Sequence, residues 1–171
     1  MYLLQLPSTS KPSDKTDLFS NSDTPQRSLF ILSGENSTIP KGEIEALAKT
    51  YSKQPEISFP CNRVAIINGP LDPVIISKRA AYIRMGGISI GSMDLPLNET
   101  FKGIDLTKLP DFKSFAARVY NFSKVAIPPE VEGSLGYAVK EIFPSSKVSL
   151  KSPDIIVVGV MCDDTFHICA V

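Results

Sequence analysis

The amino-acid sequence predicts an α+β fold built from two modules in succession. Segments with strand-like and helix-like apolar spacing alternate between residues 28 and 93. A Pro-punctuated stretch, residues 94–112, then separates them from a second group of such segments. That second group ends in two apolar runs joined by Asp163-Asp164, which is the pattern of a β-hairpin. We therefore expect a first domain at 28–93, a linker at 94–112 and a second domain at 113–171.

The first module begins with an apolar run at residues 28–33, typical of a buried strand. Pro40 then suits the first position of a helix, whose apolar face repeats every three or four residues at Ile44, Leu47, Ala48 and Tyr51. The remaining expected elements are two strands at 56–60 and 63–69, a helix from Asp72-Pro73 to Ile83 that stops at 85–87, and a short strand at 88–92. The resulting order, βαββαβ, is that of ferredoxin-like folds.

The second module begins with a strand at residues 114–122 that alternates apolar and polar side chains. A helix with an acidic first turn starts at Pro128-Pro129 and stops at Pro144. Gly133 and Gly136 lie inside it and suggest close approach by another backbone. A strand at 147–150 follows, before the terminal hairpin.

Val148 and Leu150 stand at strand spacing in that segment, and we expect both to be anchored in the core. Replacement of a fully buried Leu150 by Ala would cost about 2–5 kcal/mol. Pro153-Asp154 would set the exit of the strand. Lys147 and Lys151 then remain as its exposed charges.

Composition narrows the possible partners. Residues 7–27 hold few large apolar side chains, which predicts a flexible tail. The apolar residues 1–6 either belong to this tail or form a short strand that docks on the body, and we expect the tail. Lys+Arg and Asp+Glu are equal at 18 each, so bulk charge favours neither DNA nor a membrane surface. No run approaches the ~18 apolar residues of a membrane span. Three cysteines without regular spacing argue against a disulfide framework and favour a reducing cytoplasm.

The second module resembles the THUMP domain, an RNA-binding module of tRNA-modifying enzymes. Three pieces in the right order carry the resemblance: the strand Ser114–Val119, a helix containing Leu135-Gly136, and the stretch Lys147–Asp154 ahead of the terminal hairpin. In the family the third piece usually reads Lys-Val-Asp-Leu-x-x-Pro-Asp. Ser149 stands here where Asp is common, which is a mild departure.

The first module is similar to the N-terminal ferredoxin-like module of archaeal-type tRNA guanine-10 N2-methyltransferases. The similarity lies in Ser33-Gly34-Glu35-Asn36 at the end of the first strand and in the helix segment 43–47. In that family a THUMP domain and then a Rossmann-like methyltransferase domain follow. The resemblance covers residues 28–171.

The resemblance implies a substrate-binding role without catalysis in this chain. The sequence has neither a Gly-rich loop after a strand nor an Asp/Asn-Pro-Pro-Tyr/Phe motif, the parts that hold S-adenosylmethionine and the target amino group in the family. We expect the N-terminal part of a longer protein, which captures the 3′ end of tRNA for a methyltransferase domain or subunit that uses S-adenosylmethionine. Two alternatives stay open: a stand-alone RNA-binding accessory protein, and a protein–protein interaction domain that pairs through a sheet edge.

The candidate RNA contacts are basic residues of the second module. Residues 112–151 hold six basic side chains against three glutamates, so the segment has a net charge of six minus three, or +3. Such an excess can contact phosphates independently of sequence. The candidates are Arg118, Lys147 and Lys151 first, then Lys113, Lys124 and Lys140. Four nearby aromatic residues could stack on unpaired bases: Tyr120, Phe122, Tyr137 and Phe143.

Some residues near the C-terminus could belong to a metal-binding site or to the active site of a hydrolase. Cys162, His167 and Cys169 are candidate ligands, but a two-residue turn at Asp163-Asp164 would pair Val160 with His167 and Val158 with Cys169. The three side chains would then be spread along a sheet, and Cys61 could not easily join them. We therefore expect neither a metal site nor a catalytic one.

Overall fold

The computed structural model describes residues 26–95, 101 and 103–171. Along the described chain lie β1 (Arg27–Leu32), α1 (Ile39–Tyr51), β2 (Glu56–Cys61), β3 (Val64–Asn68), α2 (Pro73–Arg79), β4 (Ile83–Asp94), the 3-10 turn η2 (Leu106–Lys108), β5 (Ser114–Asn121), α3 (Glu130–Ile142), β6 (Lys147–Val148), β7 (Ile155–Cys162) and β8 (Thr165–Ala170). The predicted α+β class is confirmed. Of the predicted tail, residues 1–25 lie outside the described residues, and Arg27 already belongs to β1. No helix in the described ranges is long and apolar enough to cross a membrane.

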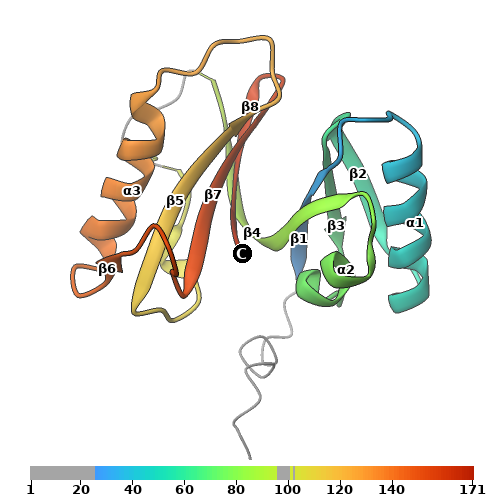
Figure 1. Ribbon diagram of the computed structural model, residues 1–171, viewed down its shortest axis with the longest axis horizontal. Helices are drawn as coiled ribbons and strands as arrows, with labels where there is room; N and C mark the ends of the chain where they lie inside the picture. Colours follow the sequence, from blue (N-terminus) through green and yellow to red (C-terminus); the bar gives the residue numbers. More distant parts are fainter. Residues whose placement is uncertain (1–25, 96–100, 102) are drawn as a thin grey trace, which may run out of the picture.

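The strands form a single eight-stranded sheet with the order β2-β3-β1-β4-β8-β7-β5-β6 (Figure 1). Strands β2, β3, β1 and β4 pair antiparallel, and with α1 and α2 they complete the predicted βαββαβ order. In the second half β5 runs parallel to β7 and β6, while β7 and β8 form the terminal hairpin. Its register is the one predicted, with Val160 opposite His167.

Strand β4 passes from one half of the sheet to the other. It pairs with β1 up to Ile88 and with β8 from Ile88 to Asp94. The predicted helix stop at 85–87 is therefore wrong, because α2 ends at Arg79 and these residues lie inside β4. At Gly86 and Gly87, atoms of neighbouring residues lie so close to the strand that they leave no room for a side chain. A Cβ would lie 2.6 Å from the Phe30 ring at Gly86 and 2.3 Å from the Ala170 carbonyl oxygen at Gly87.

Residues 94–112, expected to be a linker, contribute to the core of the second half. Phe101, Ile104, Leu106 and Leu109 are buried there, beneath α3 and against Phe166 of β8. The Phe101 and Phe166 rings lie 5.8 Å apart. The connection is therefore packed onto the body in its described part.

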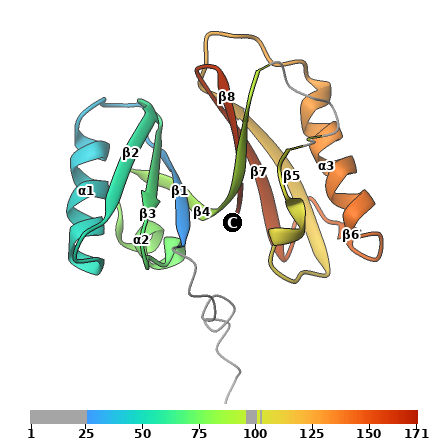
Figure 2. The same cartoon turned by 180° about the vertical axis from the view of Figure 1, so that it is seen from behind.

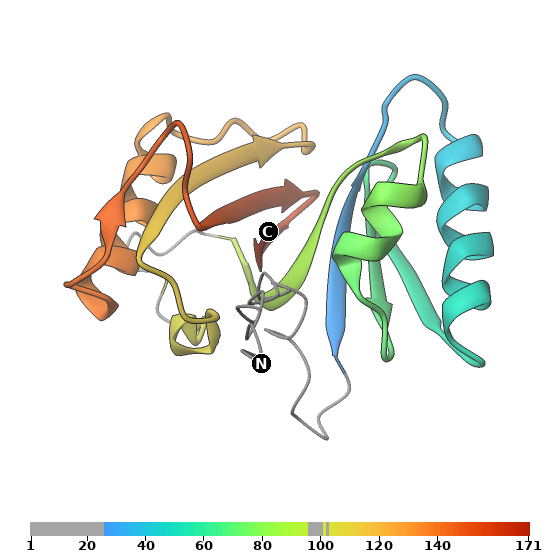
Figure 3. The ribbon, with the colours of Figure 1, turned by 60° about the horizontal axis from the view of Figure 1, so that its bottom comes forward.

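The sheet bends so that its two halves face each other, with α1 and α3 on the outer sides (Figures 1 and 2). Side chains from both halves meet in one apolar cluster, here called the seam. It contains Leu29, Ile31, Val64 and Ile66 from the first half and Val158, Val160, Cys162 and Cys169 from the second. Each half also has a core of its own beneath its helices. Figure 3 shows the two halves from below, with β4 crossing between them.

A disulfide joins Cys61 to Cys162 across the two halves, with the Cα atoms 5.7 Å apart. The expectation that the cysteines form no disulfide is therefore wrong for this pair. Spacing along the chain did not indicate the bond, because it depends on the bend of the sheet. Cys169 remains a free, buried thiol.

The predicted strand at 147–150 is reduced to two residues at the sheet edge. Val148 and Leu150 are 61% and 66% exposed, so the prediction that both are anchored in the core is wrong. The space beneath α3 at this edge is already filled by aromatic rings. Phe112 lies 5.7 Å from Phe115 and 4.9 Å from Phe143.

Candidate nucleic-acid interface

Three of the predicted RNA-contacting lysines come together where β5 begins and β6 pairs with it. Lys113, Lys147 and Lys151, here called the basic edge, are all exposed. The Lys147 backbone N–H donates to the Lys113 carbonyl oxygen at 2.8 Å, and Ser114 pairs with Lys147 in the parallel ladder. The fold therefore gathers residues that are 38 positions apart (151 minus 113) at one end of the sheet edge.

Asp154 holds the loop that carries these lysines. Its Oδ2 accepts hydrogen bonds from the backbone N–H groups of Lys113 (3.0 Å) and Ser114 (2.8 Å). Its own N–H donates to the Ser114 carbonyl oxygen at 3.0 Å. Because one carboxylate binds two backbone donors, the exit of the loop is pinned to the start of β5. This agrees with the prediction that Pro153-Asp154 sets the exit of the segment.

The basic edge also presents apolar side chains. Val148 and Leu150 lie between Lys147 and Lys151 in the sequence and are exposed to solvent. Large aliphatic side chains at this exposure, next to lysines, suit a ligand with both negative charge and apolar surface. An unpaired nucleic-acid strand has both features, since its phosphates and its base faces are open together.

Arg118, near the middle of β5, is tied to its neighbours but remains accessible. Its Nη1 donates to the Ala117 carbonyl oxygen at 2.8 Å and lies 3.5 Å from Glu132 Oε1. The two side chains of this ion pair are 38% and 44% exposed. The other carboxylate oxygen of Glu132 accepts from the Val119 N–H at 3.0 Å. A phosphate that binds Arg118 would share its guanidinium group with Glu132.

The remaining two predicted lysines lie apart from the basic edge. Lys124 is exposed in the loop after β5, at the opposite end of that strand from Lys113. The Lys140 ammonium donates to the carbonyl oxygens of Pro144, at 2.7 Å, and of Ser146. It thus binds carbonyl oxygens just beyond the C-terminus of α3, where a positive charge is favourable.

Of the four aromatic residues considered for stacking, Tyr137 alone is open to solvent, at 66% exposure. Tyr120 and Phe122 stack on each other at 6.2 Å and pack on the seam, and Phe143 packs against the core of the second half. Glu141 accepts a hydrogen bond from the Tyr137 hydroxyl and thereby raises its pKa. Tyr137 is therefore the candidate for stacking on a base.

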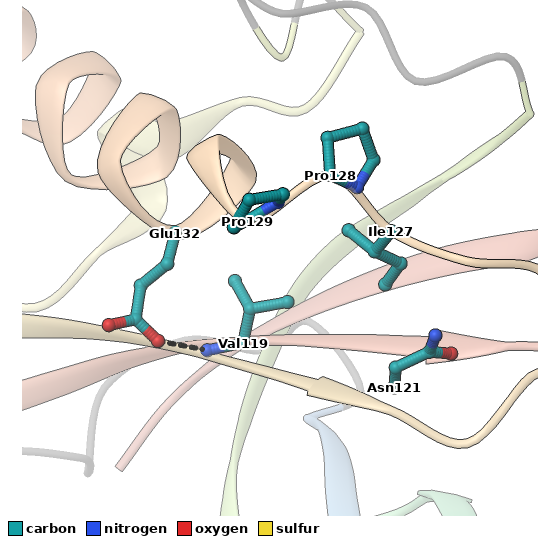
Figure 4. A pocket seen from close by; sticks show the side chains of 6 residues that line it. All are labelled: Val119, Asn121, Ile127, Pro128, Pro129 and Glu132. Carbon is teal, nitrogen blue, oxygen red and sulfur yellow. Dashed lines mark hydrogen bonds between the residues drawn. The ribbon is translucent and has the colours of Figure 1, made fainter.

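A shallow pocket of about 320 Å³ lies beside the free edge of β5 (Figure 4). Val119, Asn121, Ile127, Pro128, Pro129 and Glu132 line it. Its polar groups are already engaged, since the Asn121 amide donates to the Val125 carbonyl at 2.7 Å and Glu132 accepts from Val119. The pocket could therefore hold a group of complementary shape, but its Asn121 and Glu132 side chains are already hydrogen-bonded within the protein. No motif in the sequence indicated this pocket, although Pro128 and Pro129 form part of its wall.

The residues considered for metal or nucleophilic chemistry do not form a site. The Cys162 sulfur is bonded to Cys61. Burial raises the pKa of Cys169 to about 12, so its thiol stays protonated and unreactive at neutral pH. Burial, with Arg27 nearby, lowers the pKa of His167. Within the described part of the chain, no group of three or more His, Cys, Asp and Glu side chains could hold a metal ion.

Comparison with known proteins finds a relative among the tRNA-modifying enzymes. No family model matches the chain. A curated relative, the tRNA (guanine(10)-N2)-dimethyltransferase of Methanocaldococcus jannaschii, is 27% identical over 161 residues. The match covers 81% of this chain and 45% of that protein. The chain thus spans less than half the length of the curated relative it matches.

Solved structures share the fold at low sequence identity. TrmN from Thermus thermophilus superimposes with a TM-score of 0.57 at 13% identity, covering 84% of this chain and 45% of that one. A 4-thiouridine synthetase in complex with RNA and ATP gives 0.56 at 13% identity, covering 86% and 41%. PH1313 from Pyrococcus horikoshii gives 0.54 at 13% identity, covering 85% and 54%. At this identity the likeness establishes the fold alone.

Proposed function

We propose that this chain is a tRNA-binding region that captures the acceptor 3′ end and positions the tRNA for a guanine-N2 methyltransferase domain outside these 171 residues. The match to a tRNA (guanine(10)-N2)-dimethyltransferase carries the proposal, because it covers 81% of this chain but less than half of that enzyme. The region would hold the substrate, and the chemistry would take place elsewhere.

S-adenosylmethionine would be the cofactor of that other domain. Rossmann-type sites hold their ligands at Gly-rich strand-to-helix loops. The three strand-to-helix connections described here, residues 33–38, 69–72 and 122–129, contain at most one glycine each. The described residues therefore do not fit the cofactor, and we derive no chemical step through it in this chain.

The surface chemistry supports an unpaired strand as the part of tRNA that is bound. Lysines at the basic edge suit phosphates, while Val148, Leu150 and Tyr137 suit exposed ribose and base faces. In a duplex the base faces are stacked away, so exposed apolar side chains would gain little there. The 3′ end of tRNA is a single strand with both groups open.

A gel-shift experiment with charge-reversed variants tests the proposal. Lys147→Glu with Lys151→Glu is expected to weaken tRNA binding and to reduce the slope of log affinity against log salt by about 2. Lys49→Glu with Lys53→Glu is the matched control, since it makes the same charge change at exposed positions of α1 and its C-terminal turn, in the other half. Equal loss in both pairs would remove the basic edge from the binding site.

Trimmed tRNA tests the acceptor-end part of the proposal. Removal of the 3′ CCA is expected to weaken binding to the wild-type chain and to leave the residual affinity insensitive to Lys147→Glu with Lys151→Glu. Unchanged affinity for trimmed tRNA would show that the chain grips another part of the molecule.

The exposed edge strand favours a second candidate, a protein-interaction domain. Among the described residues, β5 has no strand partner on its β6 side beyond Phe115. On β5, side chains of Glu132 and Arg118 bind the Val119 N–H and the Ala117 carbonyl, so an added strand would have to displace any of these contacts that lie on that edge. An extended segment of another protein could add to such an edge. Absence of tRNA binding at low salt would contradict both the substrate-positioning role and a stand-alone RNA-binding accessory role, and would leave this candidate.

A further inference from the structure

The Cys61–Cys162 disulfide joins the tips of two hairpins from different halves of the molecule. Cys61 is the last residue of β2 and Cys162 the last of β7, so each lies directly before a tight turn. The two residues are 101 positions apart in the sequence. Both turns sit at the open end of the bent sheet, away from the point where β4 crosses from one half to the other (Figure 1).

The bond exists because the sheet folds back on itself. In the order of the sheet, β3, β1, β4 and β8 lie between β2 and β7. In a flat sheet these four strands would hold the two cysteines more than 20 Å apart at about 4.8 Å per strand step. The observed Cα–Cα distance is 5.7 Å. The disulfide therefore requires that the two halves of the sheet face each other, which is here called the closed arrangement.

Other contacts near the bond are weaker and reversible. The Arg63 guanidinium lies 4.6 Å from the centre of the Phe122 ring across the same opening. The seam joins the two halves through mainly apolar side chains, while each half keeps a core beneath its own helices. Loss of the covalent bond would leave both cores and β4 intact and would free the two tips from each other. The β7–β8 tip would still be bound to the end of β4, where the Leu95 N–H donates to the Asp164 carbonyl oxygen at 3.0 Å.

We propose that Cys61–Cys162 is a redox-cleavable latch, which fixes the two halves of the sheet in the closed arrangement when oxidised and frees the β2–β3 and β7–β8 tips when reduced. This inference goes beyond the proposed function and does not depend on it.

The chemistry of opening is thiol–disulfide exchange with a dithiol reductant. One thiolate of the reductant attacks the sulfur of Cys61, which is partly exposed, whereas Cys162 is 2% exposed. The bond to Cys162 breaks, and Cys162 leaves as a thiolate that takes up a proton. The second thiol of the reductant then attacks the mixed disulfide, so that Cys61 leaves and is protonated and the reductant departs as a disulfide. Two electrons enter the protein, and a disulfide oxidant reverses the reaction.

The third cysteine does not compete for the bond. Cys169 pairs with Val158 in the ladder, whereas Cys162 pairs with Thr165 beside the turn. Burial keeps its thiol protonated, as its raised pKa shows, and only the thiolate attacks a disulfide. The same bond can therefore reform after each reduction without reshuffling.

Thiol counting and hydrogen exchange on the full chain test the latch. In an oxidising glutathione buffer, the denatured chain is expected to show one free thiol, and after dithiothreitol three. Reduction is expected to speed amide exchange about tenfold at residues 60–64 and 160–165, because opening of the tips is then a local event. Exchange in α1 and α3 is expected to stay the same.

Two variants serve as controls. Cys61→Ser with Cys162→Ser should show the exchange pattern of the reduced chain with or without dithiothreitol. Cys169→Ser should respond to dithiothreitol as the wild type does. Three free thiols in the oxidising buffer would overturn the inference, as would identical exchange in the two redox states. Exchange that rises throughout both cores on reduction would also overturn it, since the bond would then hold the whole fold together.

Discussion

At the scale of single residues, leucines that look alike in the sequence meet opposite surroundings. Leu135 is fully buried on the inner face of α3, whereas Leu150 is 66% exposed at the sheet edge. Leu135→Ala is expected to lower the free energy of unfolding by about 2–5 kcal/mol, because it leaves a cavity. Leu150→Ala should change it by less than about 0.5 kcal/mol, since no packed volume is lost. Urea denaturation of the two variants measures both values, and equal losses would contradict the exposed position of Leu150.

The buried His167 is expected to make the free energy of unfolding depend on pH. Burial, and then Arg27, lower its pKa below the usual 6.5, while Asp94 opposes the shift. The unfolded chain therefore binds the proton first as the solution is acidified, so this residue's contribution is fully present above pH 6.5 and is lost as the pH falls below it. The fall in unfolding free energy below pH 6.5 is expected to be smaller in His167→Gln than in the wild type. Identical pH profiles in denaturation experiments would contradict this origin.

At the scale of elements, two glycines predict opposite effects of the same substitution. A Cβ at Gly133, inside α3, would meet nothing within 4 Å, so Gly133→Ala is expected to stabilise the protein by about 0.4–1 kcal/mol. A Cβ at Gly87 would lie 2.3 Å from the Ala170 carbonyl oxygen, so Gly87→Ala must push β4 away from the end of β8. Thermal unfolding should show Gly133→Ala above and Gly87→Ala below the wild type.

Gly133 and Gly136 also show where element-level prediction stops. Two glycines in a helix suggested close approach by another backbone. Gly136 does face β5, but a Cβ there would lie 3.6 Å from the Ala117 Cβ, an ordinary contact, and Gly133 faces open space. Helical spacing places both residues on α3 correctly, but a glycine in a helix does not by itself indicate that another backbone packs against it.

At the scale of the whole molecule, the coupling between the two halves can be measured through one contact at the opening. Arg63 donates from Nε to the Leu32 carbonyl oxygen at 2.9 Å and places its guanidinium over Phe122. A double-mutant cycle with Arg63→Met and Phe122→Leu is expected to give a coupling energy of about 0.5–2 kcal/mol. A coupling of zero in urea denaturation would show that the cation–π contact does not join the halves.

Much of the fold could be predicted from local pattern. The βαββαβ order and the pairing of Val160 with His167 follow from period-two spacing and a two-residue turn, both short-range properties. That residues 83–94 form one continuous strand could not be predicted in this way. A Gly-Gly pair can end a helix, and it can equally lie in a strand where a neighbouring chain approaches closely. The Cys61–Cys162 bond depends on the bend of the sheet, which no local pattern encodes.

The candidate site was predictable in part for the same reason. Lys113, Lys147 and Lys151 gather because β5 and β6 pair. The spacing of apolar residues predicted both strands, but it did not indicate that they pair. The role of Lys140 at the end of α3 and the burial of Tyr120 and Phe122 at the seam depend on tertiary packing. Charge and aromatic content alone therefore overestimated the number of accessible contacts.

Strand β4 also bears on how such a protein can be divided, in the laboratory or by gene fission. Strand β4 pairs with strands of both halves. A cut after Asp94 would therefore leave residues 88–94 without their partner β8 in one fragment. In the other fragment, the edge of β8 that pairs with β4 would be exposed. Unpaired edges of this kind promote aggregation and strand exchange. The two modules have distinct folds, but they share strand β4. We therefore expect them to occur together, as a single structural unit, in any protein that contains them.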